Sequence, residues 1–436
     1  MSLPAYKGPF GAAQAERLLW RAGFGPRPGQ AKALAKKGVK NAVLSLTRPA
    51  GEKLVGPAPT DDKKVPIAPL DARGHELLWW LDRMVRTSAP TPERMTLIWH
   101  DWFATSIVGV KSQKLMLDQN QLLRKGGLGS FAELLLNVTK DPAMLLWLSG
   151  NKNTRLSPNE NYARELMELF TLGAQRGYDE SDVREQARAL TGWRGYYRQK
   201  TGASDFRYEP NLHDTGIKTV FGKKGNFDWQ DACRLCLEHP LHPSFFVRRL
   251  WSYFIPTAPG KKTQAELEKL YRGKYQVRPV VEAILQHPDL YRGPRMVKPP
   301  VVYTAGLLRA MGRGVDSTRW VRLTLTAGQR LFLPPDVSGW DDERWLDTAT
   351  LRGRWDLVAW ALRSVALDEK ATGLPSDAFK LLTQAQSFWH VPGLLPGTRK
   401  VLLDFGQRSL AAKASPATVL NALRQLIAIS PDLQTA

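Results

Sequence analysis

One predicted helix, spanning residues 160–172, carries acidic side chains at a spacing that could support chemistry. At 100° per residue, Glu160, Arg164 and Glu168 share its polar face, whereas Glu165 falls at the edge of its apolar face. A carboxylate at that edge is partly removed from water, so it must find a partner or take up a proton. Glu165 is therefore the candidate for a general acid or base.

A structural interpretation of the same helix stays open. Glu160 is also the last residue of a predicted capping box that starts at Ser157. Arg164 follows Glu160 and precedes Glu168 at i,i+4 spacing, and such pairs contribute about 0.3–0.5 kcal/mol each. Glu165 has no partner of this local kind.

Carboxylates together with a histidine could also hold a divalent metal ion. Glu160 and Glu168, with His100 from a predicted helix over 95–103, form the candidate ligand set. A single histidine on a helix is more often a surface residue or one with its hydrogen bonds satisfied than a metal ligand. A divalent metal is therefore the cofactor that the sequence allows.

A second candidate for acid–base chemistry lies in a long polar stretch. His213 and Asp214 are adjacent, and a histidine beside a carboxylate can act as a general base. The same pair could instead cap and order the loop. Asp214 also opens the Asp-Thr-Gly triplet of aspartic proteases, but one copy in a helical chain excludes that chemistry, which needs two carboxylates.

Basic and aromatic side chains supply candidates for substrate binding. Arg164, Lys218 and Lys298 could bind an anionic group, and Trp193 and Trp340 could stack on a sugar ring or a base. If the protein is an enzyme of this kind, Glu165 and His213 are expected to lie in one pocket.

Composition limits the kind of protein. The 436 residues include 62 Lys+Arg and 41 Asp+Glu, a net charge of +21 that favours an anionic ligand or polymer as partner. Nucleic acid is a less favoured partner because the basic residues are dispersed and form no Lys/Arg-rich tract. Two cysteines exclude a disulfide-stapled scaffold. No apolar run is long enough to cross a membrane, and no secretory signal is recognisable, which predicts a cytoplasmic protein unless a partner takes it to the envelope.

The pattern of helix caps and apolar periodicity predicts an all-α fold, a large multi-helix body with long irregular loops and few short strands. Strands are expected only at 107–110, 218–221 and 321–325. Cys233 and Cys236 fall within a predicted helix and are expected to be reduced thiols. We predict a main helical body over residues 1–354, with functional loops near 196–225 and 330–350, and a C-terminal helical part over 355–436.

Seven stretches of the chain resemble a known bacterial family. The family is called domain of unknown function eighteen hundred, and the similarity runs from about Gln14 to Pro431. The stretches are, in order, AERLLWRAGFGPRPGQ, ERMTLIWHDWFATS, DQNQLLRKGGLGSFAELLLNVTKDPAMLLWL, PNENYARELMELFTLG, YDESDVREQARALTGW, HDTGIKTVFGKKGNFD and FLPPDVSGWDDERWLDTATLRGRW.

The resemblance implies a largely helical protein and, by association in this family, a partner that resembles sulfatases and alkaline phosphatases. Relatives commonly read Trp-His-Asn-His-Phe where this chain has Trp-His-Asp-Trp-Phe. Trp102 thus replaces a second histidine near His100.

Three functional hypotheses follow. The first is a hydrolase that acts on an anionic phosphate- or sulfate-bearing substrate, or on a glycan, through a Glu/His cluster. The second is a non-enzymatic binding or assembly partner of the sulfatase- or phosphatase-like protein. The third is a basic nucleic-acid-binding protein.

Overall fold

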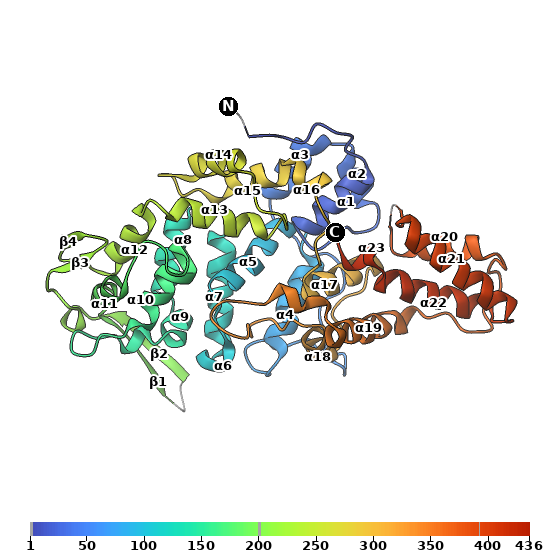
Figure 1. The fold of residues 1–436 in the computed structure, drawn as a ribbon. Helices are drawn as coiled ribbons and strands as arrows, with labels where there is room; N and C mark the ends of the chain where they lie inside the picture. The colour runs from blue at the N-terminus through green and yellow to red at the C-terminus, as the bar shows by residue number, and fades with distance from the viewer. Residues whose placement is uncertain (1–2, 199–201, 392) are drawn as a thin grey trace. The chain divides into compact units, whose positions relative to one another are not determined.

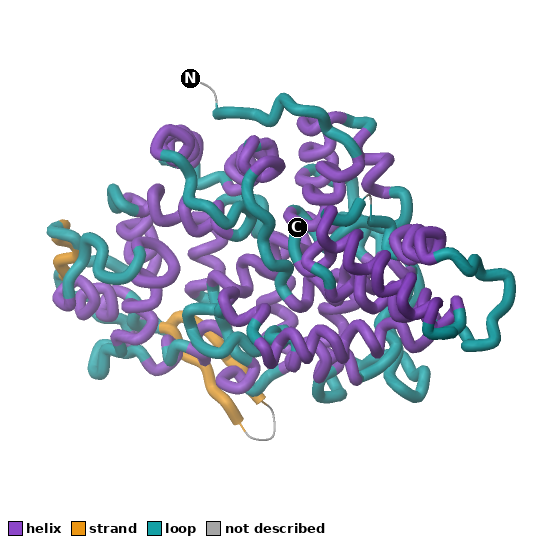
Figure 2. Tube along the Cα trace, turned by 45° about the vertical axis from the view of Figure 1, so that its right-hand side comes forward, coloured by secondary structure: helices purple, strands orange, loops and turns teal. Residues whose placement is uncertain are grey.

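The computed structural model describes residues 3–198, 202–391 and 393–436. Helices and their connecting loops make up almost all of it, and strands occur only as two antiparallel pairs in these residues, so the predicted all-α class is confirmed (Figures 1 and 2). Within the described residues, no helix has both the length and the apolar character that a bilayer-spanning segment needs. The chain forms two compact units: unit 1 is built chiefly from Pro92–His287 and Phe332–Trp340, and unit 2 from Tyr6–Thr91, Pro288–Leu331 and Asp341–Ala436.

Unit 1 holds the acidic helix and both pairs of strands. Its elements are α5 (Pro90–Trp102, which begins in unit 2), α6 (Ile107–Val110), α7 (Gln113–Gly126), α8 (Phe131–Thr139), α9 (Pro142–Trp147), η1 (Gly150–Lys152), α10 (Glu160–Glu165), η2 (Leu166–Leu172), α11 (Glu180–Ala189), β1 (Trp193–Arg198), β2 (Gly202–Tyr208), η3 (Pro210–Leu212), β3 (Lys218–Val220), β4 (Lys223–Gly225), α12 (Trp229–Glu238), α13 (His242–Ser252), α14 (Lys261–Tyr271) and α15 (Val277–Gln286).

Unit 2 contains the helices from both ends of the chain. Its elements are α1 (Ala12–Arg21), α2 (Gln30–Ala35), α3 (Gly38–Thr47), α4 (His75–Arg86), α16 (Pro288–Arg292), α17 (Pro300–Met311), α18 (Arg319–Thr326), η4 (Asp342–Leu346), α19 (Thr348–Leu362), η5 (Arg363–Val365), α20 (Ala378–Phe388), α21 (Pro396–Ala411), α22 (Pro416–Ile429) and α23 (Pro431–Gln434). In Figure 1, α20, α21 and α22 lie side by side in red. The predicted domain boundary at residue 354 falls inside α19.

Side-chain caps place several helix starts where the sequence predicts them. Ser130 accepts a hydrogen bond from the backbone N–H of Glu133 at 3.4 Å, and Asp141 accepts one from Met144 at 2.9 Å. Each cap satisfies an N–H group that the first helical turn leaves without a partner. The helix at 160 is capped by Asn159 rather than by the predicted Ser157 box.

Two of the three predicted strands are wrong. Residues 107–110 form the short helix α6 and residues 321–325 lie in α18, whereas Lys218–Val220 is the strand β3. Both misassigned runs are short and β-branched, and tertiary packing overrides the weak strand preference of such residues. The predicted irregular loop at 196–225 contains two strand pairs, and residues 199–201 of it lie outside the described residues.

The core of unit 1 is a cluster of aromatic rings. Trp99, Trp102, Phe103, Phe131 and Phe246 are all completely or almost completely buried. The rings of Phe131 and Phe246 have centroids 4.8 Å apart, and those of Trp99 and Trp102 lie 5.3 Å apart. Aromatic pairs at such distances add about 0.5–1.5 kcal/mol beyond their burial. This cluster gives α5, α8 and α13 a rigid common core.

The two cysteines are free and lie in α12, as the sequence predicts, and the structure shows that both are buried. Burial raises the pKa of both the Cys233 and the Cys236 thiol to about 12. Thiols in this state are unreactive, so the pair belongs to the core.

Candidate functional site

Glu165 is the last residue of α10, and its side chain is half-buried. The pKa of Glu165 is raised to about 7, chiefly by burial and to a smaller extent by the carboxylates of Glu168 and Asp336, against the opposing effect of Arg164. Burial disfavours the charged form, and neighbouring negative charges disfavour it again. Glu165 therefore exchanges its proton near neutral pH.

Arg164, whose charge opposes this shift in the pKa of Glu165, forms ion pairs with other carboxylates. Its guanidinium donates to both carboxylate oxygens of Glu180 at 2.8 Å and to Glu160 at 3.2 Å. Two carboxylates thus share this cation. Its positive charge compensates Glu165 only in part, which leaves burial as the dominant influence.

The chain changes helix type directly after Glu165. Residues Leu166–Leu172 form a π-helical turn, η2, where the sequence predicts a continuous α-helix. Three carbonyl groups of this turn accept hydrogen bonds from side chains of other elements: Leu169 from Arg249, Phe170 from Trp102 at 3.2 Å, and Thr171 from Nδ1 of His242 at 2.9 Å. π-Helical turns are rare and often found at functional sites.

These external donors explain why the turn is stable. A π-helix pairs its carbonyls less regularly than an α-helix does, and buried carbonyls need partners. Arg249 also lies over the ring of Trp102, 4.6 Å from its centroid. Trp102 is therefore a structural donor in this chain.

The loop that carries Asp336 is anchored on α5 by Asp101. The Asp101 carboxylate accepts hydrogen bonds from the backbone N–H of Trp340 at 2.7 Å and from the Tyr253 hydroxyl at 2.5 Å. Gly339 has a φ of 101°, and a Cβ there would lie 2.4 Å from an Asp101 oxygen. Only glycine fits this approach without strain. The anchor fixes the loop that places the charge of Asp336 near Glu165.

His100 and Trp340 lie beside this anchor. His100 is 1% exposed, and its ring centroid is 5.5 Å from those of Phe332 and Trp340. Burial lowers the pKa of His100 to about 3, so the imidazole is neutral. The indole N–H of Trp340 is buried and has no hydrogen-bond acceptor among the described residues.

His213 and Asp214 belong to another set of contacts. Asp214 accepts from Nε of Arg188 at 2.7 Å, and this guanidinium lowers the pKa of Asp214. His213 is buried, and its Nδ1 lies 3.1 Å from both the hydroxyl and the carbonyl oxygen of Thr191. Lys218 is also buried, and its ammonium donates to the Asp214 carbonyl. These bonds order the loop.

The remaining predicted binding residues are also held by protein contacts. Trp193 is half-buried against Tyr208 and Trp229, with ring centroids 5.5 and 5.3 Å away. Lys298 lies in unit 2, buried over the ring of Trp20 at 3.6 Å, and donates to the Leu433 carbonyl at 2.6 Å. Its burial lowers its pKa.

The described residues contain no group of three or more His, Cys, Asp or Glu side chains arranged to hold a metal ion. Glu160 is paired with Arg164, and His100 is enclosed by aromatic rings. The metal set of Glu160, Glu168 and His100 therefore stays a prediction without geometric support.

Asp101, Glu165 and Asp336 come from three of the seven stretches that resemble the known family, and all three residues lie in unit 1. A family model described as a protein of unknown function, DUF1800, matches residues 17–435. The chain belongs to the DUF1800 family. Comparison with the curated proteins and with the solved structures gives no match.

Sequence reasoning missed two residues of the candidate site in this DUF1800 protein. Asp101, next to the candidate His100, anchors the loop, and Asp336 contributes charge to the site. One sequence signal could have indicated Asp336: an Asp two residues before Ser338 forms a local turn, here with a 2.8 Å bond from the Ser338 N–H to the carboxylate. The partner of Asp101 is 239 residues away in sequence, so no local pattern reveals it.

Proposed function

We propose that this DUF1800 protein is a hydrolase in which Glu165 is the acid–base group. One observation carries the proposal: a half-buried carboxyl group lies near two further carboxylates, while Arg164, whose charge opposes their effect, is bound to Glu160 and Glu180. A carboxyl group that exchanges its proton near pH 7 is suited to general acid catalysis.

The charge of the site favours a glycosidic bond among the candidate substrates. A phosphate or sulfate ester would bring negative charge toward Glu168 and Asp336 and be repelled. A glycan is neutral at its scissile bond, and glycoside hydrolysis uses two carboxyl groups, one protonated and one ionised. The buried indole N–H of Trp340 offers a donor for a hydroxyl group.

The proposed roles follow from that chemistry. Glu165 gives its proton to the leaving-group oxygen as the glycosidic C–O bond breaks, and Glu168 or Asp336 takes a proton from the water whose oxygen bonds to the sugar carbon. One water is consumed and two hydroxyl groups form. No proton transfer is assigned to His213 or Asp214, because Thr191 and Arg188 bind them.

A binding role is the second candidate, supported by the net charge of +21. It covers an anionic polymer, a sulfatase- or phosphatase-like partner protein, and nucleic acid. Each of these predicts affinity that decreases steeply as salt increases. A hydrolase acting at an uncharged bond predicts turnover that changes little with salt.

A substrate panel tests the first proposal. Wild-type protein and Glu165→Gln are incubated with polysaccharides and aryl glycosides, and in parallel with aryl phosphates and aryl sulfates. We expect new reducing ends from at least one glycan with wild type only. The proposal would be refuted if the wild-type protein hydrolysed the aryl phosphates or sulfates instead, or if it turned over no substrate. Equal turnover by Glu165→Gln and wild type would refute it as well.

A further inference from the structure

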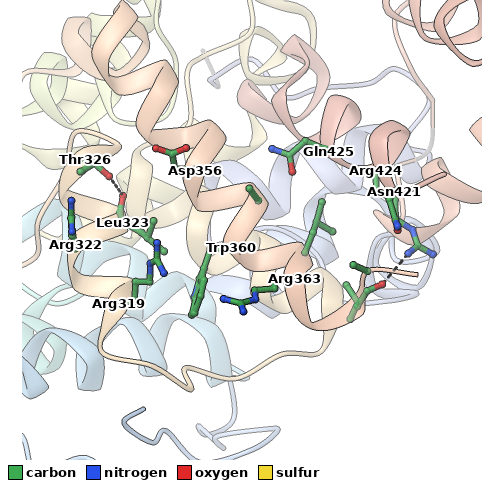
Figure 3. Close-up of a pocket in the computed structure, with 14 residues that line it drawn as sticks. Arg319, Arg322, Leu323, Thr326, Asp356, Trp360, Arg363, Asn421, Arg424 and Gln425 are labelled. Atoms are coloured by element: carbon green, nitrogen blue, oxygen red, sulfur yellow. Dashed lines mark hydrogen bonds between the residues drawn. The ribbon is translucent and has the colours of Figure 1, made fainter. Parts of the chain in front are cut away.

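A cavity of about 670 Å³ opens in unit 2 between α18, α19, η5 and α22. Figure 3 shows the side chains that line it, with Arg319 and Arg363 on either side of Trp360. The volume is in the range of sites for small organic ligands and exceeds what an inorganic ion fills. The cavity also has an apolar wall, formed by Leu323, Leu362 and Val365.

Four arginines line this cavity against one carboxylate. They are Arg319, Arg322, Arg363 and Arg424, and the carboxylate is Asp356. Asp356 is already paired with Arg352 at 3.3 Å. In the part of the chain that the structure describes, none of the four arginines forms an ion pair with a carboxylate. The cavity therefore concentrates positive charge that the protein itself does not neutralise.

Trp360 holds two of these guanidinium groups in place. Arg319 lies over its ring at 4.5 Å and Arg363 at 5.6 Å from the centroid. Such stacking orients a guanidinium and leaves its N–H groups available. The Arg424 guanidinium donates to the Val365 carbonyl at 3.2 Å and lies over the Phe388 ring at 4.4 Å. Three of the four arginines are thus positioned by contacts within the protein.

We infer that this cavity binds a small organic anion that carries phosphate or sulfate groups. Guanidinium groups match the oxygens of such groups with paired, charge-assisted hydrogen bonds. The apolar wall and the volume accommodate the organic part of the ligand. This binding site is separate from the proposed hydrolase site, since all its residues belong to unit 2.

A neighbouring cavity in unit 2 has a different balance of charged residues. It has a volume of about 390 Å³ and shares Trp360 and Arg363. Its carboxylates are Asp62 and Asp316, of which Asp316 pairs with Arg313 at 3.0 Å. Three cationic side chains (Lys64, Arg313 and Arg363) face two carboxylates there, against four and one in the first cavity, so the anionic group is placed in the first cavity.

The test is calorimetric titration of the full-length protein with phenyl phosphate, phenyl sulfate and inorganic phosphate at low salt. We expect at least one ester to bind more tightly than inorganic phosphate. The double variant Arg319→Gln/Arg363→Gln should weaken ester binding about ten- to hundredfold, since each lost bond is charge-assisted. Both side chains are exposed, so the fold should be retained.

The matched control is Arg344→Gln/Arg408→Gln, which removes the same charge from exposed arginines of unit 2 that do not line the cavity. This control variant should bind phenyl phosphate and phenyl sulfate with the same affinity as the wild-type protein. Absence of ester binding to wild type, or equal weakening in both double variants, would overturn the inference. Glu165→Gln should bind the esters normally, which separates this result from failure of the proposed hydrolase.

Discussion

Replacement of Asp101 by alanine is expected to lower the free energy of unfolding of unit 1 by about 3–5 kcal/mol. The variant loses the acceptor for the Tyr253 hydroxyl and for the Trp340 N–H. It also loses the negative charge that favours the charged form of Arg94, a side chain that is only 4% exposed. A buried cation without compensation is the most costly of these losses. Denaturant unfolding followed by tryptophan fluorescence measures the change.

Two further variants make the Asp101 experiment specific. Asp101→Asn keeps one hydrogen-bond acceptor, so its free energy of unfolding should decrease by only about 1–2 kcal/mol. Asp118→Ala, in the exposed pair with Lys114, should change stability by less than about 0.5 kcal/mol. If Asp101→Ala behaves like Asp118→Ala, then the loop that bears Asp336 is not held by this anchor.

Glu165→Gln is expected to reduce hydrolysis about 10²–10⁴-fold, because glutamine has no proton to give. The Glu165→Gln variant should also be more stable than the wild-type protein at pH 8. The folded-state pKa of about 7 lies above the reference value of 4.5, so the stability from protonation is complete below about pH 4.5 and is lost as pH rises through 7. Since Glu165 is half-exposed, solvent screening limits this difference to about 1–2 kcal/mol.

The matched control for Glu165→Gln is Glu133→Gln, an exposed glutamate of α8. It should retain both the activity and the pH dependence of wild type. Wild-type turnover should decrease as pH rises through about 7, where Glu165 loses its proton. A Glu165→Gln variant that is active, or one whose stability still declines between pH 5 and pH 8 as in wild type, contradicts the assignment.

Much of the fold follows from local sequence. Asp179 and Asp228 each accept hydrogen bonds from the first helical turn and complete capping boxes, and they begin α11 and α12. Such signals lie within four residues of each helix start. The π-helical turn could not be predicted this way, because its carbonyl partners, Trp102, Arg249 and His242, come from distant parts of the chain.

The same distinction applies to the site. Helical periodicity predicts partial burial of Glu165, and the structure agrees. The position of Asp336 near Glu165 depends on the hydrogen bond from the Trp340 N–H to the Asp101 carboxylate. Helical periodicity describes neighbours along one helix and cannot predict a bond between residues so far apart in sequence. The charge of Lys218 and Lys298 predicts substrate binding, yet both ammonium groups donate to backbone carbonyls inside the protein. Charge alone does not distinguish a binding lysine from one that orders a loop.

The most direct test of the central claim is a carboxyl-carbon NMR titration of Glu165 in the wild-type protein, with the resonance assigned by its absence in Glu165→Gln. We predict a midpoint near pH 7, because burial and the charges of Glu168 and Asp336 favour the protonated form. A midpoint at or below the ordinary glutamate value of 4.5 would mean that Glu165 is ionised throughout the neutral range. It would then have no proton to donate, and the account of this site would be wrong.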